Sequence, residues 1–474
     1  MRHGSTRETY PCGLATPRKC GTLRGNAMRL FYAAILLLLA GPGRATDTAA
    51  IAIVVGDMHS AYDRTAQFVA RIDRVRAENP GVPLAILIDG DTFELGNAVA
   101  RRSEGAIEFA MLAALAQRAP TVLNLGNHEP EFFDMAETVA RVRAAGVAVV
   151  GGNARDHTTG KAFADPAARL KLGKLDAVVV GITTDRLATF RLAVRPTLDL
   201  SDPVVWAGQN LPALLKDQPL PIVLSHAGLH ADRAMLPLVP DGTLFAGAHD
   251  HLRFVQHEGR MVYFHSGSWT EFISIARLQQ TAAGLNWGIE QVRIAPDDPV
   301  DEKLATLIRE TLAKYLTAEE TTVVGRSARA LGPTDAAMFV VEAARQAAGV
   351  DAAAIGGTTF GAGLPAGDVS RFALDACVRF DSTLFVGEVS GAQLQKILAR
   401  ANQGPDTPFA AREGENLIAA APPMIEPGKR YRLVTTDWGA HNAKAYFGDA
   451  APTFSERPEL KLKATVMSAL TPAK

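Results

Sequence analysis

The sequence predicts an α/β protein of at least two domains. The first observation is length, because 474 residues are too many for one ordinary domain. The second is composition, since 47% hydrophobic and 21% charged residues are typical of a folded protein. The third is that apolar runs of strand length alternate with segments of helical spacing. A net charge of −1 gives no polyelectrolyte character, so we expect no nucleic-acid polymer as a partner.

The N-terminus predicts an export signal. Met28-Arg29 precedes an apolar run at residues 30–40, and small residues suited to cleavage follow near Ala45. The run is too short to span a membrane, and the Gly-Pro-Gly after it argues against a buried helix. We therefore expect residues 1–45 to be an extension and signal peptide, starting at Met1 or Met28. The mature protein is expected to be periplasmic or secreted, with no stable membrane anchor.

The first α/β domain is expected at residues 47–290, where strand and helix patterns alternate. Apolar runs predict strands at residues 51–55, 84–88, 123–125, 147–150, 177–182, 221–224, 244–246 and 261–264. Helical spacing of apolar residues predicts helices at residues 61–78, 106–118 and 132–145.

A second α/β domain is expected at residues 326–460, after a linker helix within residues 297–325. Asp297-Asp298-Pro299 marks the break, and residues 300–316 follow with an amphipathic pattern. Further along, the patterns predict helices at residues 334–348 and 391–401 and strands at residues 384–389 and 431–435. The chain after residue 456 is polar with little periodicity, which predicts no further element.

Polar side chains that can bind a metal follow five of the predicted strands. They are Asp57 and His59, then Asp91, then Asn127 and His128, then His226, and finally His249 and His251. Open α/β sheets place their sites at the carboxyl ends of strands, so these residues are expected to meet. Each alone has an ordinary interpretation, as a hydrogen-bonded core histidine or as an aspartate that caps a helix. Five such strand ends together favour a metal site.

The residue types indicate a site for two transition-metal ions. Asp57 and His59 are two residues apart, so on an extended segment both point to the same side. The two oxygens of Asp91 can bridge two ions. A mixed carboxylate, amide and imidazole set suits Mn, Zn, Co or Fe better than Mg or Ca. Two ions about 3.5–4 Å apart can hold a phosphate and generate hydroxide at neutral pH. His128 is expected to stay free, steadying phosphoryl oxygens or protonating the leaving group.

The motif series resembles a known family. Asp57-x-His59, Gly90-Asp91, Gly126-Asn127-His128-Glu129, His226 and Gly247-x-His249-x-His251 are similar to the calcineurin-like metallophosphoesterase signature. Their order and spacing resemble the exported 5′-nucleotidase family over roughly residues 50–450. The resemblance implies a four-layer α/β/β/α first domain and a smaller 5′-nucleotidase-like substrate domain. It also implies metal one on Asp57, His59, Asp91 and His251, and metal two on Asp91, Asn127, His226 and His249.

Two places depart from the family pattern. After Asn-His-Glu the family has Phe and then an Asp that pairs with the catalytic histidine, whereas this chain has Pro130 and Glu131. Glu131 is expected either to keep that pairing or to begin a helix after the proline. The family's Asn-x-Gly-Gly-x-Arg is also absent, since residues 354–360 contain neither its Asn nor its Arg. The resemblance places the two base-stacking aromatics on Phe380 and Trp438, which could instead belong to the core.

The sequence therefore predicts a hydrolase that acts on a small-molecule phosphate ester by attack of a metal-bridging hydroxide. A nucleotide is the expected substrate, by the resemblance to 5′-nucleotidases, with a role in nucleotide catabolism. The alternatives are a 2′,3′-cyclic-nucleotide or UDP-sugar hydrolase, a SoxB-like thiosulfohydrolase, or a non-catalytic ligand-binding protein. The last is disfavoured because every expected type of metal ligand is present.

Overall fold

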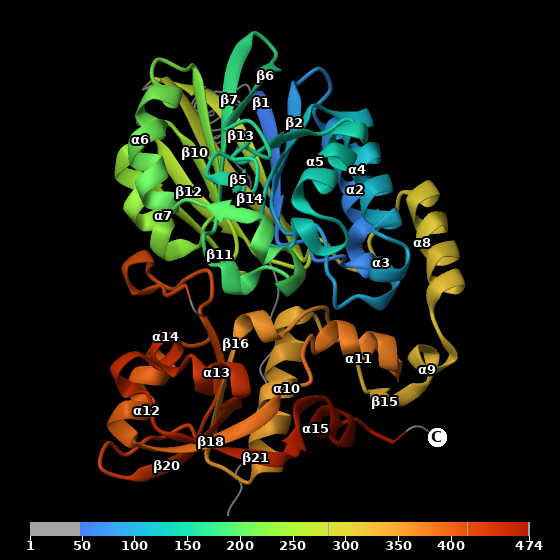
Figure 1. Ribbon diagram of the computed structural model, residues 1–474, viewed down its shortest axis with the longest axis vertical. Coiled ribbons are helices and arrows are strands. Elements are labelled where there is room, and N and C mark those ends of the chain that lie inside the picture. The colour runs from blue at the N-terminus through green and yellow to red at the C-terminus, as the bar shows by residue number, and fades with distance from the viewer. Residues whose placement is uncertain (1–47, 283, 415, 473–474) are drawn as a thin grey trace, which may run out of the picture. The chain divides into compact units, whose positions relative to one another are not determined.

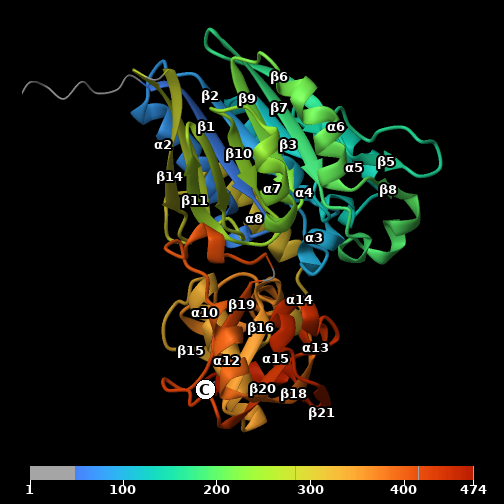
Figure 2. The same ribbon diagram turned by 90° about the vertical axis from the view of Figure 1, so that its left-hand side faces the viewer.

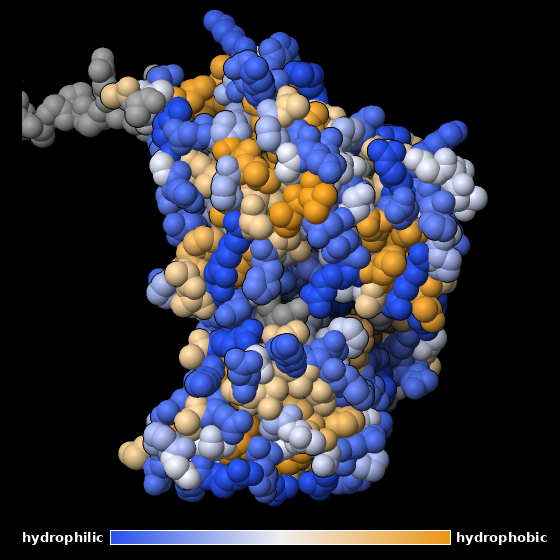
Figure 3. Space-filling view, turned by 60° about the vertical axis from the view of Figure 1, so that its left-hand side comes forward, coloured by the Kyte–Doolittle hydropathy of each residue, from blue (hydrophilic) through white to orange (hydrophobic). Residues whose placement is uncertain are grey.

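A computed structural model describes residues 48–282, 284–414 and 416–472. The predicted extension and signal peptide, residues 1–45, lies outside the described residues. Within the described part of the chain, no helix is both long and apolar enough to cross a membrane. Charged and polar residues cover most of the face shown in Figure 3, with apolar patches between them.

Two six-stranded sheets form the first part of the chain (Figure 1). The first has the order β14-β13-β1-β2-β3-β4, with β1 (Thr48–Gly56), β2 (Leu84–Asp89), β3 (Thr121–Asn124), β4 (Ala148–Val150), β13 (Phe272–Thr281) and β14 (Gly284–Arg293). The second has the order β11-β12-β10-β9-β7-β6, with β6 (Ala167–Leu172), β7 (Leu175–Thr183), β9 (Leu220–His226), β10 (Leu244–Gly247), β11 (Arg253–Glu258) and β12 (Met261–Ser266). The central strands of each sheet are parallel, so their carboxyl ends share one edge.

Helices cover the outer face of each sheet, which gives four layers (Figure 2). The first sheet packs against α2 (Tyr62–Glu78), α4 (Ala106–Arg118) and α5 (Met135–Ala144), and the second against α6 (Pro203–Leu215) and α7 (Leu229–Met235). Strand β1 shows why the sheets stack. Ile51, Ile53 and Val55 face the helices, whereas Ala50, Ala52 and Val54 face the second sheet. This alternation buries both faces of one strand.

The later part of the chain forms a smaller α/β unit. Its five-stranded sheet has the order β19-β16-β20-β18-β21, with β16 (Ala352–Gly356), β18 (Thr383–Ser390), β19 (Leu417–Ala420), β20 (Arg430–Thr436) and β21 (Phe454–Lys461). Its helices are α10 (Pro333–Ala348), α11 (Arg371–Cys377), α12 (Gly391–Ala399), α13 (Asp437–His441), α14 (Ala443–Phe447) and α15 (Leu462–Ala469). In the sequence, the two parts are connected by α8 (Glu302–Tyr315) and α9 (Ala318–Thr321). The remaining helix and strands are α3 (Ala98–Arg102), β5 (Ala154–Asp156), β8 (Leu198–Leu200), β15 (Val323–Ser327) and β17 (Gly367–Ser370).

Two sequence-based boundaries were wrong. The chain after residue 456 is not irregular, because it completes β21 and forms α15. Leu462, Val466 and Leu470 recur every four residues and are buried in the core, but three apolar positions are a weak signal for a helix. The helix expected from residue 132 begins at Met135, because the Asp134 side chain accepts a hydrogen bond from the Glu137 backbone N–H and caps the helix there.

Candidate metal centre

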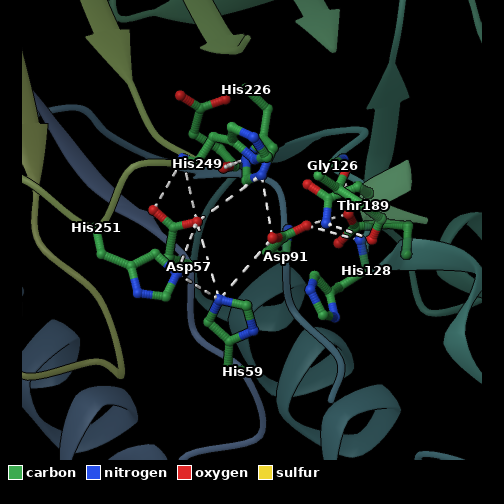
Figure 4. A network of polar contacts seen from close by, with 12 residues as sticks. Asp57, His59, Asp91, Gly126, His128, Thr189, His226, His249 and His251 are labelled. Atoms are coloured by element: carbon green, nitrogen blue, oxygen red, sulfur yellow. Dashed lines mark hydrogen bonds and ion pairs between the residues drawn. The ribbon is translucent and has the colours of Figure 1, made fainter. Parts of the chain in front are cut away.

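The carboxyl ends of five strands gather the seven predicted ligands, and Figure 4 labels six of them. Asp57 and His59 follow β1, Asp91 follows β2, Asn127 follows β3, His226 is the last residue of β9, and His249 and His251 follow β10. Six of the seven fall into two groups that could each hold an ion, Asp57 with His59 and His251, and Asp91 with His226 and His249. Within each group one ligand atom per residue lies within 4.8 Å of the others.

Both aspartates lie between the two groups. Asp91 Oδ2 is 3.1 Å from His226 Nε2 and 3.9 Å from His59 Nε2. Asp57 Oδ1 is 3.8 Å from His226 Nε2 and 3.9 Å from His251 Nε2. In each aspartate a single carboxylate oxygen therefore faces both groups.

The remaining contacts orient the ligand side chains so that their metal-binding atoms face one another, which is the arrangement that a metal site needs. The Nδ1–H of His226 donates to the Asp89 carbonyl at 2.7 Å, which turns its buried Nε2 toward Asp91. Asn127 donates through Nδ2 to the Thr189 carbonyl at 3.3 Å, and its Oδ1 is buried without a hydrogen-bond donor in the described chain. His59 and His251 turn their Nε2 atoms toward each other at 3.0 Å. These residues fit two divalent ions.

The backbone at the site adopts left-handed conformations. Asp57, His59, Asp91, His249 and His251 have φ angles of 50°, 47°, 53°, 79° and 57°. The extended segment expected for Asp57 and His59 is therefore wrong, because β1 ends at Gly56 and the chain turns. Non-glycine residues in this region cost of order 1–3 kcal/mol each, and such residues cluster at functional sites.

Glu129 fixes the loops that follow β2 and β3. Its Oε2 accepts hydrogen bonds from the backbone N–H groups of Asp91, at 2.9 Å, and Gly126, at 2.6 Å. Its Oε1 accepts one from Thr92 at 2.9 Å. A single buried carboxylate thus fixes the position of Asp91 relative to the loop that carries Asn127, although the sequence suggested no role for Glu129.

His128 lies beside the ligands with its Nδ1 3.0 Å from Glu131 Oε1. Glu131 also belongs to a short 3₁₀ turn, Glu129–Glu131. Burial opposes the charge on His128, but Asp91 and Glu131 outweigh it and raise the pKa of the imidazole to about 9. For Asp91, His226 and His128 likewise outweigh burial and hold the carboxyl pKa well below its ordinary value. Asp91 and His128 therefore stabilise each other's charged forms.

Sequence reasoning missed Glu94 and Arg379. Glu94 Oε2 lies 3.3 Å from His59 Nδ1 and also accepts a hydrogen bond from Arg379 Nη2. Burial opposes the charge on Glu94, but Arg379 and His59 hold its carboxyl pKa far below the usual value. Glu94 is three residues after Asp91, and Arg379 directly precedes Phe380. Adjacency to predicted site residues was the signal that could have found them.

The two predicted aromatic residues are not in the core. Phe380 is 52% exposed and Trp438 is 47% exposed. Such exposure of large rings is compatible with contact to a ligand, whereas it contradicts the alternative that each ring simply fills the core.

A buried polar network supports the carboxyl ends of β9 and β10. Ser225 donates to Asp232 at 2.5 Å, Tyr263 donates to Asp232 at 2.8 Å, and the Tyr263 hydroxyl lies 2.7 Å from His265 Nε2. His265 is thus a member of this network. Nearby, Asp250 accepts a hydrogen bond from the Leu229 backbone at 2.6 Å.

Gly247 packs directly against this network, so we expect Gly247→Ala to destabilise the protein by about 1–3 kcal/mol, as overpacking does. An added Cβ would lie 2.2 Å from His265 Nε2 and 2.4 Å from Asp232 Oδ2. Denaturant unfolding followed by circular dichroism measures the effect. Gly208→Ala is the matched control, because nothing lies within 4 Å of its Cβ on the surface of α6 and alanine favours helix. Equal unfolding free energies for the two variants would contradict the packing.

The comparisons with known proteins agree with this geometry. Residues 52–253 match the model of calcineurin-like phosphoesterases, and residues 315–417 match that of the 5′-nucleotidase C-terminal domain. No curated protein sequence gave a significant match. Together the two matched domains define the class of the protein, which is a phosphoric ester hydrolase. The chain belongs to the 5′-nucleotidase family of calcineurin-like metallophosphoesterases, and its predicted fold and enzyme class are confirmed.

Solved structures share the fold across most of the chain. A 5′-nucleotidase precursor from Thermus thermophilus is 17% identical, covers 89% of this chain and 96% of its own, and has a TM-score of 0.57. The sulfate thiohydrolase SoxB from the same organism is 14% identical over 90% and 95%, with a TM-score of 0.61. A 5′-nucleotidase from Candida albicans is 12% identical over 89% and 97%, with a TM-score of 0.58. At these identities the likeness shows the fold alone.

Proposed function

We propose that the protein is a metal-dependent phosphomonoesterase that releases phosphate from a nucleotide. The observation that carries the proposal is the set of buried ligand atoms at the strand ends, in particular Asn127 Oδ1, which has no hydrogen-bond donor within the described residues, and His226 Nε2, which faces Asp91 Oδ2 at 3.1 Å. Buried polar atoms are normally satisfied, so the Asn127 oxygen points to a ligand. The chemistry of the donors favours Mn, Zn, Co or Fe over Mg or Ca.

We assign one ion to Asp57, His59, Asp91 and His251 and the other to Asp91, Asn127, His226 and His249, with Asp91 bridging. The distances from Asp91 Oδ2 to His226 and His59 support that assignment. Two such ions would supply Lewis acidity at the phosphate and lower the pKa of a water molecule. The chain itself holds the ligands rigidly, since the strained backbone and Glu129 fix the loops before substrate arrives.

We assign proton transfer to His128. Glu131 lies 3.0 Å from its Nδ1 and fixes the ring, so that Nε2 is the atom left to face the leaving oxygen. The proton on Nε2 would pass to the ester oxygen as the bond to phosphorus breaks. This places Glu131 as a positioning residue that acts through His128.

Removing Phe380 or Trp438 should raise KM for a nucleotide while leaving kcat nearly unchanged. If the two exposed rings hold the base, each alanine variant should raise KM for AMP by about 5-fold to 150-fold, because stacking on an aromatic ring contributes about 1–3 kcal/mol. Steady-state kinetics with AMP and with p-nitrophenyl phosphate, which lacks the base, separate this effect from general damage.

Met424→Ala is the matched control, since Met424 is a large exposed apolar side chain at 78%. The nucleotide assignment would be wrong if the Phe380 and Trp438 variants hydrolysed AMP as well as Met424→Ala does. Preference for UDP-glucose, a 2′,3′-cyclic nucleotide or a thiosulfonate in the same assay would replace the nucleotide with that substrate.

We also propose that the protein is exported, on the strength of the apolar run at residues 30–40 and the small residues near Ala45. The mass of the protein recovered from the periplasm or medium would reveal whether cleavage occurs there.

A further inference from the structure

A cavity of about 580 Å³ lies beside the metal centre, yet none of the described residues that line it is a proposed metal ligand. Its wall comes from residues in the stretches 60–64, 94–98, 293–297, 330–332 and 362–376, with Trp269, Glu320 and Arg379. The residues assigned to proton transfer and to base stacking, His128, Phe380 and Trp438, are not among them. Small-molecule sites usually have volumes of about 300–1,000 Å³. We propose that the cavity is a second binding site, which takes an uncharged molecule of aromatic size that offers a hydrogen-bond acceptor.

Three residues of this wall carry a buried N–H group that lacks an acceptor. The groups are Arg64 Nε, Trp269 Nε1 and Arg379 Nε, and none of them has a hydrogen-bond partner within the described residues. The residues are closed to solvent, since Arg64 is 1% exposed, Trp269 is 3% exposed and the Arg379 side chain is 5% exposed. Buried polar groups are normally satisfied, so three such donors around one cavity favour a ligand that brings acceptors.

The charge of the wall selects an uncharged ligand. Carboxylates outnumber guanidinium groups there, with Asp63, Glu94, Asp297, Glu320 and Asp375 against Arg64, Arg293 and Arg379. A phosphate or a carboxylate would therefore meet a net negative charge. A cation gains little either, because most of these carboxylates are in ion pairs already, Asp63 with Arg64, Glu94 with Arg379, Glu320 with Arg102 and Asp375 with Lys463. A protonated amine also offers donors only, whereas a ketone, ester or amide carbonyl accepts from N–H groups.

Apolar side chains form much of the rest of the wall. They include Ala61, Leu331, Leu364 and Phe372 as well as the ring of Trp269. Such groups favour a molecule with apolar surface, because removing that surface from water drives binding. Aromatic side chains also pair with flat rings in stacked or edge-on arrangements. The wall therefore suits a ring that carries a carbonyl, with the ring against the apolar groups and the oxygen toward the N–H donors.

Trp269 connects this wall with the metal centre. Its backbone N–H donates to the Asp57 carbonyl at 2.7 Å, and its ring stacks on the His59 imidazole with the centroids 5.3 Å apart. Asp57 and His59 are both assigned to one ion, so a molecule that packs on Trp269 touches a residue that supports two ligands of that ion. Coupling between two sites is reciprocal, so metal binding should in turn change the affinity of the cavity. This effector role, unlike the binding itself, rests on the proposed function.

The test is saturation-transfer NMR with three probes of similar size, acetophenone, benzoate and protonated benzylamine. We expect saturable binding of acetophenone to the metal-stripped protein and weaker binding of the two ions. Trp269→Phe keeps a ring beside His59 but removes the indole N–H, so acetophenone affinity should fall by about 2-fold to 12-fold, the range of one neutral hydrogen bond. Ala330→Trp should abolish saturable binding, because it fills the cavity from an exposed position of the wall. Loading with Mn should change the acetophenone affinity of the wild type by about fivefold or more.

Ala140→Trp is the matched control, because Ala140 is exposed on α5 and does not line the cavity, so this variant should bind acetophenone as the wild type does. The second site is overturned if acetophenone does not bind, if its binding survives Ala330→Trp, or if benzoate binds more tightly. Equal acetophenone affinity with and without Mn would overturn the effector role. Phosphate release by the wild type is measured separately, so the proposed function can fail while the cavity still binds acetophenone. If Trp269→Phe fails to fold, Ala330→Trp decides by the same measurement.

Discussion

Asp91→Asn is expected to lower kcat/KM for phosphate esters by about a hundredfold or more. The substitution keeps the volume of the side chain but replaces an anionic oxygen that lies between His226 and His59. A bridging ligand affects both ions, and each ion contributes several kcal/mol of transition-state stabilisation. Metal content, measured by mass spectrometry, should fall together with turnover.

Asp176→Asn is the matched control for this substitution. Asp176 is a surface residue of β7 that pairs with Lys171, and its side chain is 52% exposed. Its loss should change neither metal content nor rate, because exposed ion pairs contribute little. An Asp91→Asn protein that binds two ions and works at the wild-type rate would contradict a bridging role.

His128→Ala should separate chemistry from metal binding. We expect kcat to fall by about 10²-fold to 10⁴-fold, the usual contribution of a general acid, while both ions remain bound. The reason is that Asn127, but not His128, is assigned as a ligand, and the Asn127 side chain is oriented independently by Thr189. Glu131→Gln should produce a smaller loss, because it acts only by fixing the His128 ring.

His157→Ala provides the comparison, since His157 is exposed in a loop of the first domain. It should behave as wild type in rate and metal content. The assignment of His128 fails if its alanine variant loses an ion, or if the esters with poor and good leaving groups lose rate equally. A general acid matters most when the leaving oxygen is basic, so p-nitrophenyl phosphate should be affected less than AMP.

The strand ends could be predicted from sequence because each one is a local signal. An apolar run that stops before Asp57, Asp91 or His226 gives both the strand and the residue that it delivers. Parallel pairing then gathers these ends at one edge without any further information. The four layers required more, since the alternation of Ile51 and Ala52 shows two buried faces but not what covers them.

What could not be predicted depends on contacts distant in sequence or on backbone conformation. The amide of Asn127 is oriented by Thr189, and Glu94 pairs with Arg379, 285 residues away. No local pattern contains either pairing. The left-handed backbone of Asp57 and His59 opposes the ordinary preference of those residues, so an extended segment was the natural expectation. Strain of this kind is maintained by the surrounding fold rather than by the local sequence.

Phosphate release from AMP by the metal-stripped and reloaded protein is the decisive measurement of metal-dependent hydrolysis. We expect no release without metal, and recovery with Mn, Zn or Co at two ions per chain. Recovery with Mg should be lower, because the imidazole ligands do not suit it. Two bound ions with no phosphate released from AMP, p-nitrophenyl phosphate or any other monoester would contradict the proposed function.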